Sequence, residues 1–152
     1  MIELRENPFD PYVEIIRHQS ATPALAGRCG ASNIFVGTMR DFNEGDTVHA
    51  MRLDHYPGMT EKELLRIRDE ARQHWDILDA LIIHRVGDIL PDQTIVLAAV
   101  WASHRHAAFD ACRHLVEALK HRAPFWKKEI LSAGRERWVE TNTRAETAMP
   151  RV

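Results

Sequence analysis

Two apolar runs near the middle of the chain constrain its fold more than any other feature. They cover residues 78–86 and 94–102, and residues 87–93 between them are rich in turn formers. The longest apolar stretch, residues 95–102, has the length of a buried strand and is far shorter than the roughly 20 residues that a membrane-spanning helix needs. The two runs therefore predict neighbouring buried strands, and no membrane partner is expected.

Two helices are predicted in the first half of the chain. The first begins with Asp10 as N-cap, followed by a proline at the first helical position, and ends near residue 18. The second covers residues 61–75, because Thr60 and Glu63 form a capping box and apolar residues then recur at helical spacing.

A third, longer helix is predicted from an N-cap at Ser103 to about residue 122. It must end there because the residue before Pro124 avoids the helical region. Its inward stripe is predicted to consist of Ala108, Ala111, Cys112, Leu115 and Leu119.

Four further strands complete the pattern. They are predicted at residues 30–39, 47–56, 126–131 and 137–140. In the second of them, Val48, Met51 or Leu53 is expected to point inward. Hairpins thus alternate with helices, which predicts an α+β fold in which helices pack on a mainly antiparallel sheet. One domain is expected over residues 1–140, with a polar tail at 141–152.

Charge and cysteine content exclude several classes of protein. The 20 Lys and Arg residues nearly balance the 22 Asp and Glu residues, so bulk electrostatic capture of nucleic acid is not expected. Cys29 and Cys112 lack the spacing of a disulfide framework or a zinc ribbon. Glu3, Glu6 and Asp10 stand where a signal peptide would be apolar, which predicts a cytoplasmic protein.

A basic segment at residues 119–129 is the most informative motif. Four full positive charges lie between Lys120 and Lys128, with no acidic residue among them. A solvated turn at a helix end would explain such a run by charge alone. The two large aromatic residues inside it favour a packed turn that holds Lys120 and Lys127 in fixed places.

Two other short motifs also suit an anion. Ser103, His104 and Arg105 stand where a strand passes into a helix, and the free backbone N–H groups there bind phosphate or carboxylate. Gly37 and Arg40 combine close backbone approach with a planar donor group at a strand end. Together the motifs predict a small anionic ligand surrounded by Arg40, His104, Arg105, Lys120 and Lys127. Lysine also serves as a base or nucleophile when other cations crowd it.

Two other functions remain open on these residues. A non-catalytic phosphate- or nucleotide-binding module would use the same basic cluster without lysine chemistry. A metal-dependent hydrolase would use His106, Asp110 and His114, which share one helix face. The two histidines lie about 12 Å apart along the axis, too far for one ion unless Asp110 contributes.

Several sequence blocks, in this order, resemble the catalytic (large) subunit of molybdopterin synthase, the MoaE family. The similarity runs from about residue 30 to residue 140. The blocks are LDHYPGMT at 53–60, HRVG at 84–87, SHR at 103–105, LKHRAPFWKKE at 119–129 and RWVE at 137–140.

This resemblance implies an α/β-hammerhead fold and a sulfurtransferase activity in molybdenum cofactor biosynthesis. The substrate would be cyclic pyranopterin monophosphate, and the product molybdopterin. Two sulfurs would come from the C-terminal thiocarboxylate of a small ubiquitin-like carrier subunit. The chain would form a homodimer within a heterotetramer, and neither a cofactor nor a metal ion is implied.

The resemblance also assigns roles to individual residues. Lys120 and Lys127 would be catalytic, and the His104–Arg105 pair would hold the phosphate. The substrate-binding positions would be Thr38, Met39, Arg40, His104, Arg105, Lys120, Lys127, Lys128 and Glu129.

Overall fold

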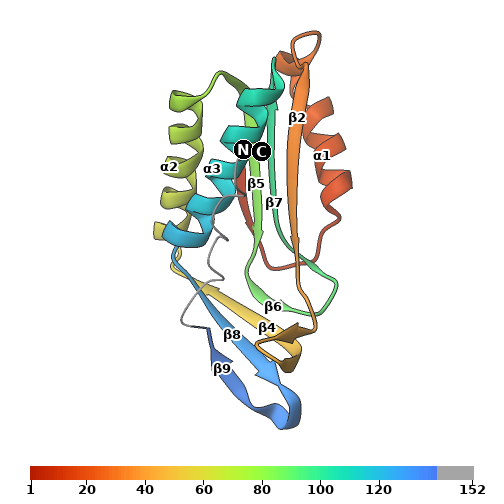
Figure 1. Ribbon diagram of the computed structural model, residues 1–152, viewed down its shortest axis with the longest axis vertical. Helices are drawn as coiled ribbons and strands as arrows, with labels where there is room; N and C mark the ends of the chain where they lie inside the picture. The colour runs from red at the N-terminus through yellow and green to blue at the C-terminus, as the bar shows by residue number, and fades with distance from the viewer. Residues whose placement is uncertain (140–152) are drawn as a thin grey trace, which may run out of the picture.

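The computed structural model describes residues 1–139, so Glu140 and the predicted tail at 141–152 lie outside the described residues. The molecule is elongated, with a larger sheet flanked by helices and a smaller sheet at one end (Figure 1). This arrangement confirms the α+β prediction. None of the helices within residues 1–139 is long and apolar enough to cross a membrane.

The larger sheet has the strand order β1-β5-β7-β2. Its central strands are β5 (Ile77–Arg85) and β7 (Thr94–Ala102), which pair antiparallel and are almost wholly buried, as the two apolar runs predict. β2 (Ala31–Thr38) pairs antiparallel with β7. β1 (Ile2–Arg5) was not predicted, and it pairs parallel with β5, so the sheet is mainly but not wholly antiparallel.

Helices cover both faces of this sheet (Figure 1). α1 (Pro11–Ser20) packs on one face, and α2 (Met59–His74) and α3 (Arg105–Arg122) pack on the other. The predicted inward stripe of α3 is confirmed, because each of its five members is at most 7% exposed. Burial of such a stripe is the main source of stability for a helix of this kind.

The side chains of β5 alternate between the two faces, as the pleat of a strand requires. Ala80 and Ile82 join the core under α2 and α3, whereas Leu81 and Ile83 join the core under α1. His84 continues the first of these two rows and therefore faces α3.

The predicted start of α2 is wrong by two residues. Gly58 is the N-cap, with φ of 82°, and its N–H donates to the carboxylate of Glu61 at 2.7 Å. A positive φ suits glycine because it has no Cβ. Thr60 is fully buried instead, and its hydroxyl donates to the carbonyl of Pro124 at 3.3 Å. This bond ties the start of α2 to the turn after α3.

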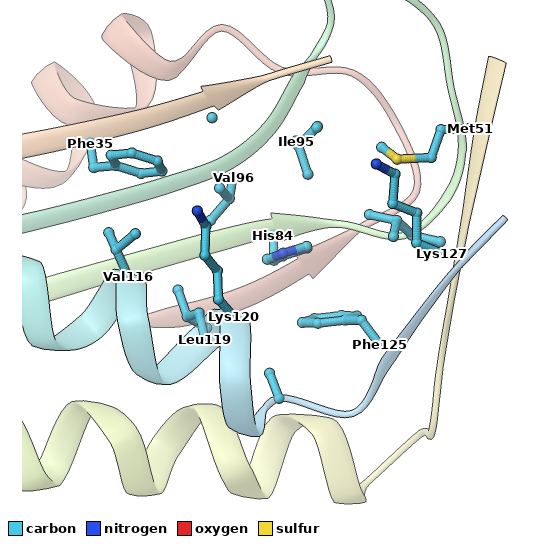
Figure 2. A pocket seen from close by; sticks show the side chains of 13 residues that line it. Phe35, Met51, His84, Ile95, Val96, Val116, Leu119, Lys120, Phe125 and Lys127 are labelled. Carbon is cyan, nitrogen blue, oxygen red and sulfur yellow. The ribbon is translucent and has the colours of Figure 1, made fainter. Parts of the chain in front are cut away.

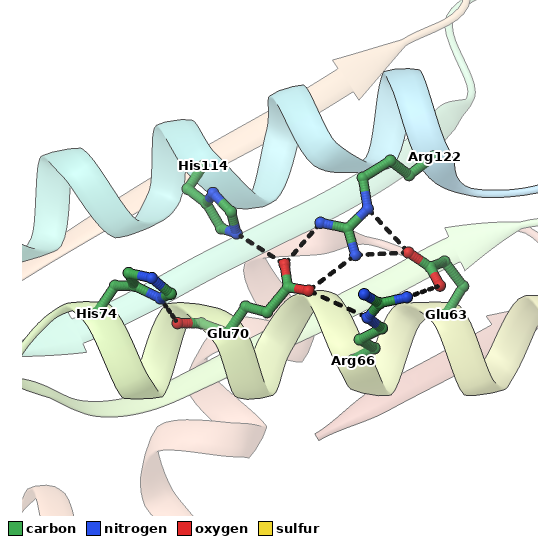
Figure 3. A network of polar contacts seen from close by, with 6 residues as sticks. All are labelled: Glu63, Arg66, Glu70, His74, His114 and Arg122. Atoms are coloured by element: carbon green, nitrogen blue, oxygen red, sulfur yellow. Dashed lines mark hydrogen bonds and ion pairs between the residues drawn. The ribbon is translucent and has the colours of Figure 1, made fainter.

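Glu63, the other member of the predicted capping box, binds across to α3. Arg122 donates to Glu63 at 2.7 Å and to Glu70 at 2.6 Å, so its guanidinium joins the two helices (Figure 3). His114 lies 3.7 Å from Glu70 in the same network. These side chains are 20–34% exposed and lie at the surface between the two helices. Each pair remains partly solvated and adds only modestly to stability.

The predicted N-cap of α3 is also wrong. The helix begins after His104, not after Ser103, and the His104 side chain does not cap it. The Ser103 backbone instead lies against Gly30, the residue before β2: a Cβ at position 30 would lie 2.3 Å from the Ser103 carbonyl oxygen. Glycine at position 30 is therefore required for this close approach.

The smaller sheet has the strand order β3-β4-β8-β9, with β6 also pairing β4. Its strands are β3 (Phe42–Asn43), β4 (Asp46–His55), β6 (Gly87–Ile89), β8 (Phe125–Leu131) and β9 (Glu136–Trp138). A register shift between residues 48 and 50 of β4 explains why Val48, Met51 and Leu53 are all buried despite their uneven spacing.

Candidate active site

A cavity of about 310 Å³ lies where α3 ends and the two sheets meet. Its walls are mostly apolar and include Phe35, Val96 and Phe125. Lys120 and Lys127 also line it, and Figure 2 shows both reaching the cavity from different sides. The pocket is of the size and character that suit a small organic ligand.

The turn between α3 and β8 brings the two lysines to one cavity. Ala123 is already extended, with φ of −69° and ψ of 128°, so the helix ends before Pro124 as predicted. Phe125 then stacks on His84 with ring centroids 4.0 Å apart. The predicted packed turn is thus confirmed for Phe125, but not for Trp126, which is 48% exposed.

Glu129 holds Lys127 in place. The carboxylate is 1% exposed, and Lys127 Nζ lies 2.9 Å from its Oε1. Asn43 donates to the same oxygen at 2.8 Å, and Arg137 donates to Oε2 at 2.8 Å. Burial alone would raise the pKa of Glu129, but the hydrogen bonds from Arg137 and Lys127 outweigh it and lower that pKa. Glu129 is therefore an ionised anchor beneath the lysine.

A smaller cavity of about 150 Å³ adjoins the first and shares Met51, Ile95 and Lys127 with it. Thr38, Met39, Arg40 and Glu129 also line this second cavity. The Arg40 guanidinium lies over the ring of Phe42, 4.8 Å from its centroid. Met39 is only 4% exposed and packs mainly in the core of the smaller sheet.

Six of the predicted site residues therefore gather at the two joined cavities. They are Thr38, Met39, Arg40, Lys120, Lys127 and Glu129. Lys128 does not join them, because side chains alternate along β8. It bonds to Glu136 at 3.0 Å and lies over the ring of Trp138.

His104 and Arg105 do not reach this site within one chain. Both are exposed and stand at the N-terminal end of α3, whereas Lys120 stands in its last turn. Fifteen residues of helix, at about 1.5 Å each, separate Arg105 from Lys120 by about 22 Å. The prediction that all five basic groups surround one ligand is thus wrong for a single chain.

The three candidate metal ligands on α3 do not converge. His106 lies 3.1 Å from Asp110, but His114 turns towards Glu70 and Trp75. Within residues 1–139, no group of three His, Cys, Asp or Glu side chains is placed to hold a metal ion. The geometry therefore does not support the alternative of a metal-dependent hydrolase.

His84 is a cavity residue that the analysis of the sequence did not single out as functional. It is 8% exposed and lines the larger cavity. The available signal was a polar residue at the end of an apolar strand, on the row that faces the helices. Asn43 and Arg137, which hold Glu129, were missed as well. Asn43 is 86 residues from Glu129 along the chain, and Arg137 reaches it only because β9 pairs with β8.

Comparison with known proteins gives consistent matches. The model of the family described as "MoaE protein" matches residues 4–122. A relative from Ralstonia nicotianae, named molybdopterin synthase catalytic subunit, is 47% identical over 150 residues, covering 99% of this chain and 82% of its own.

Solved structures match over nearly the whole chain. The molybdopterin biosynthesis MoaE protein from Burkholderia ambifaria is 42% identical, with a TM-score of 0.77 and coverage of 96% of this chain and 92% of its own. A chain from a Helicobacter pylori complex of subunits 1 and 2 of molybdopterin-converting factor is 20% identical and shares the fold. Its TM-score is 0.76, with coverage of 91% and 90%.

Proposed function

The chain belongs to the MoaE protein family, and from this premise we propose that it is the catalytic subunit of a molybdopterin synthase. It acts as a sulfurtransferase that converts cyclic pyranopterin monophosphate into molybdopterin. The observation that carries the proposal is the convergence of Lys120 and Lys127 on one cavity of about 310 Å³. The cations suit the phosphate, and the apolar walls suit the ring system.

Lys120 is the candidate for proton transfer. Opening the cyclic phosphate and adding sulfur both require protons to move, and a lysine amine can take and return them. The side chain stands in the last turn of α3 and reaches the cavity mouth (Figure 2). A cation in that position is also favourable to the helix dipole.

Lys127 is the candidate for positioning the sulfur donor. Its contact with Glu129 fixes the amine between the two cavities. A thiocarboxylate on a carrier tail would meet this cation before transfer, and a carboxylate would meet it afterwards. Removing Lys127 should therefore weaken carrier binding more than pterin binding, and the loss should be reduced at high salt.

A small ubiquitin-like carrier subunit is the proposed partner. The Helicobacter pylori structure is described as a complex of two subunits, and its fold matches this chain. A cytoplasmic heterotetramer, with two copies of this chain and two carriers, remains the proposed assembly.

A second copy of the chain offers His104 and Arg105 a role. About 22 Å of helix keeps this pair from its own lysines. Phosphate binding by His104 and Arg105 therefore requires that they enter the cavity of a neighbouring copy. The proposed homodimer provides such a neighbour.

A direct assay tests the proposed function. The purified chain is mixed with thiocarboxylated carrier and cyclic pyranopterin monophosphate, and the dithiolene product is measured. A catalytic subunit gives product in proportion to the thiocarboxylate consumed. A phosphate- or nucleotide-binding module would bind the pterin and give no product.

A further inference from the structure

His84 lies inside the larger cavity, between the two lysines (Figure 2). It is the penultimate residue of β5, on the row of side chains that faces α3. Its ring is 14° from parallel to Phe125, with centroids 4.0 Å apart. Stacking on Phe125 therefore fixes the orientation of the imidazole ring.

One nitrogen of this ring is already committed. Nδ1 lies 2.8 Å from the backbone carbonyl oxygen of Arg85. A carbonyl oxygen only accepts hydrogen bonds, so Nδ1 must carry the hydrogen. In a neutral imidazole with hydrogen on Nδ1, Nε2 presents a lone pair. Within residues 1–139, Nε2 has no hydrogen-bond partner, and it is not one of the fully buried side-chain nitrogens that lack a partner. A ligand in the cavity can therefore reach it.

The surroundings of His84 keep the ring neutral. Burial lowers its pKa to about 4, despite the hydrogen bond to Arg85, which acts the other way. The charged groups that face it across the cavity are Lys120 from α3 and Lys127 from β8. The cavity residues of β4 and β7 are apolar. A third positive charge beside two lysines would be repelled, so Nε2 remains an acceptor near neutral pH.

We propose that Nε2 of His84 accepts a hydrogen bond from an N–H or O–H group on the ring of the substrate, and so selects a donor-bearing heterocycle. This inference rests on the proposed function, since it names a contact in the same cavity. The lysines donate and recognise the anionic end of a ligand. Glu129, the carboxylate that lines the adjoining smaller cavity, is already engaged by Asn43, Lys127 and Arg137. His84 therefore supplies a hydrogen-bond acceptor for the ring of the ligand, whereas the lysines supply donors for its phosphate.

Two matched variants separate this contact from a structural role. His84→Asn places an amide N–H near the position of Nδ1, so the bond to Arg85 is kept and the acceptor in the cavity is lost. His84→Gln extends to the position of Nε2, so an acceptor is kept and the bond to Arg85 is lost. Both lose the ring stack with Phe125, so their difference isolates the two hydrogen bonds. Thermal unfolding monitors the fold of each.

Binding of cyclic pyranopterin monophosphate should weaken about five- to tenfold in His84→Asn, the range for one lost hydrogen bond. His84→Gln should bind more tightly than His84→Asn. Inorganic phosphate, the probe for the lysines alone, should bind both variants as it binds wild type. Wild-type affinity in His84→Asn, or equal losses for phosphate, would overturn the proposal. So would tighter binding by His84→Asn than by His84→Gln.

A spectroscopic measurement makes the test independent of turnover. Long-range ¹H–¹⁵N NMR of the imidazole should show hydrogen on Nδ1 in the free protein, and the Nε2 signal should move with the pterin but not with phosphate. If wild type makes no dithiolene while Nε2 responds, the proposed function fails and the His84 contact stands. If wild type turns over while Nε2 and the His84→Asn affinity do not respond, only the contact fails.

Discussion

Both ends of α3 carry basic side chains, but their surroundings within residues 1–139 differ: the C-terminal end lines the larger cavity, whereas the N-terminal end is exposed. At the C-terminal end, Lys120 meets Lys127 and His84 beside apolar walls. At the N-terminal end, His104 and Arg105 are exposed, and the backbone of Ser103 is closed off by Gly30. Basic side chains at the two ends of α3 thus have different surroundings. Enclosure by β4, β5 and β8 distinguishes the C-terminal end as the candidate site.

Lys120→Ala should reduce product formation by about 10²- to 10⁴-fold, the usual contribution of proton transfer by a side chain. The exposed side chain contributes little to folding, so the unfolding midpoint should stay near that of wild type. Lys120→Arg should also be poor, because arginine stays protonated. Turnover near the wild-type rate in a folded Lys120→Ala protein would show that Lys120 does not transfer a proton in the reaction.

Arg105→Ala should weaken pterin binding by about tenfold to a hundredfold, the loss expected for one charge-assisted bond to phosphate. Mixing Arg105→Ala with Lys120→Ala should restore part of the product formation, because one mixed site would then be intact. Unchanged affinity in Arg105→Ala would show that the N-terminal end takes no part. A mixture with no gain would mean that the two ends do not meet across copies.

Burial of His84 should make the stability of the protein depend on pH. The folded-state pKa of His84 is lowered from 6.5 to about 4, so below pH 6.5 the unfolded chain takes up a proton that the folded protein excludes. Stability is therefore present above pH 6.5 and is lost as the pH falls towards 4. Between pH 7 and pH 5 this group should cost about 2 kcal/mol in free energy of unfolding.

Denaturant titrations at the two pH values measure this loss. His84→Gln should lose about 2 kcal/mol less than wild type over the interval. Equal pH responses in the two proteins would mean that the cavity does not keep His84 neutral.

Arg122→Ala should lower stability slightly and leave pterin binding unchanged, whereas Arg105→Ala should weaken pterin binding. Arg122 also stands at an end of α3, but it binds Glu63 and Glu70 of α2 rather than a ligand (Figure 3). Its loss should lower the free energy of unfolding by about 1 kcal/mol, because these ion pairs lie at the surface and are partly solvated. Pterin affinity and turnover should not change. A large loss of affinity would extend the site to the outer face of α3.

Regular patterns of apolar residues made much of the fold predictable. The stripe of α3 and the two central strands follow directly from 3.6- and 2-residue periods. β1 was missed because its alternation of apolar and polar residues covers only four positions, and its partner strand lies more than 70 residues away. The start of α2 was missed because Gly58 takes a positive φ that a side-chain capping rule does not consider.

The residue types of the candidate site were predictable, but their arrangement was not. The run of lysines predicted Lys120 and Lys127, and both line the larger cavity. The strand pleat that separates Lys127 from Lys128 appears only once β8 is paired. The distance between Arg105 and Lys120 depends on an unbroken helix. To predict His84 as a cavity residue, one would have to know which row of β5 side chains faces the cavity.

The unbroken length of α3 fixes the distance between residues 105 and 120, and this limits which insertions the gene can tolerate. An insertion of one residue would turn everything beyond it by about 100° and carry Lys120 away from the cavity. Four inserted residues would keep the face but lengthen the rod by about 6 Å. Insertions in the turn at residues 44–45, between β3 and β4, would do neither. Viable length variants of this gene are therefore expected in that turn and not in α3.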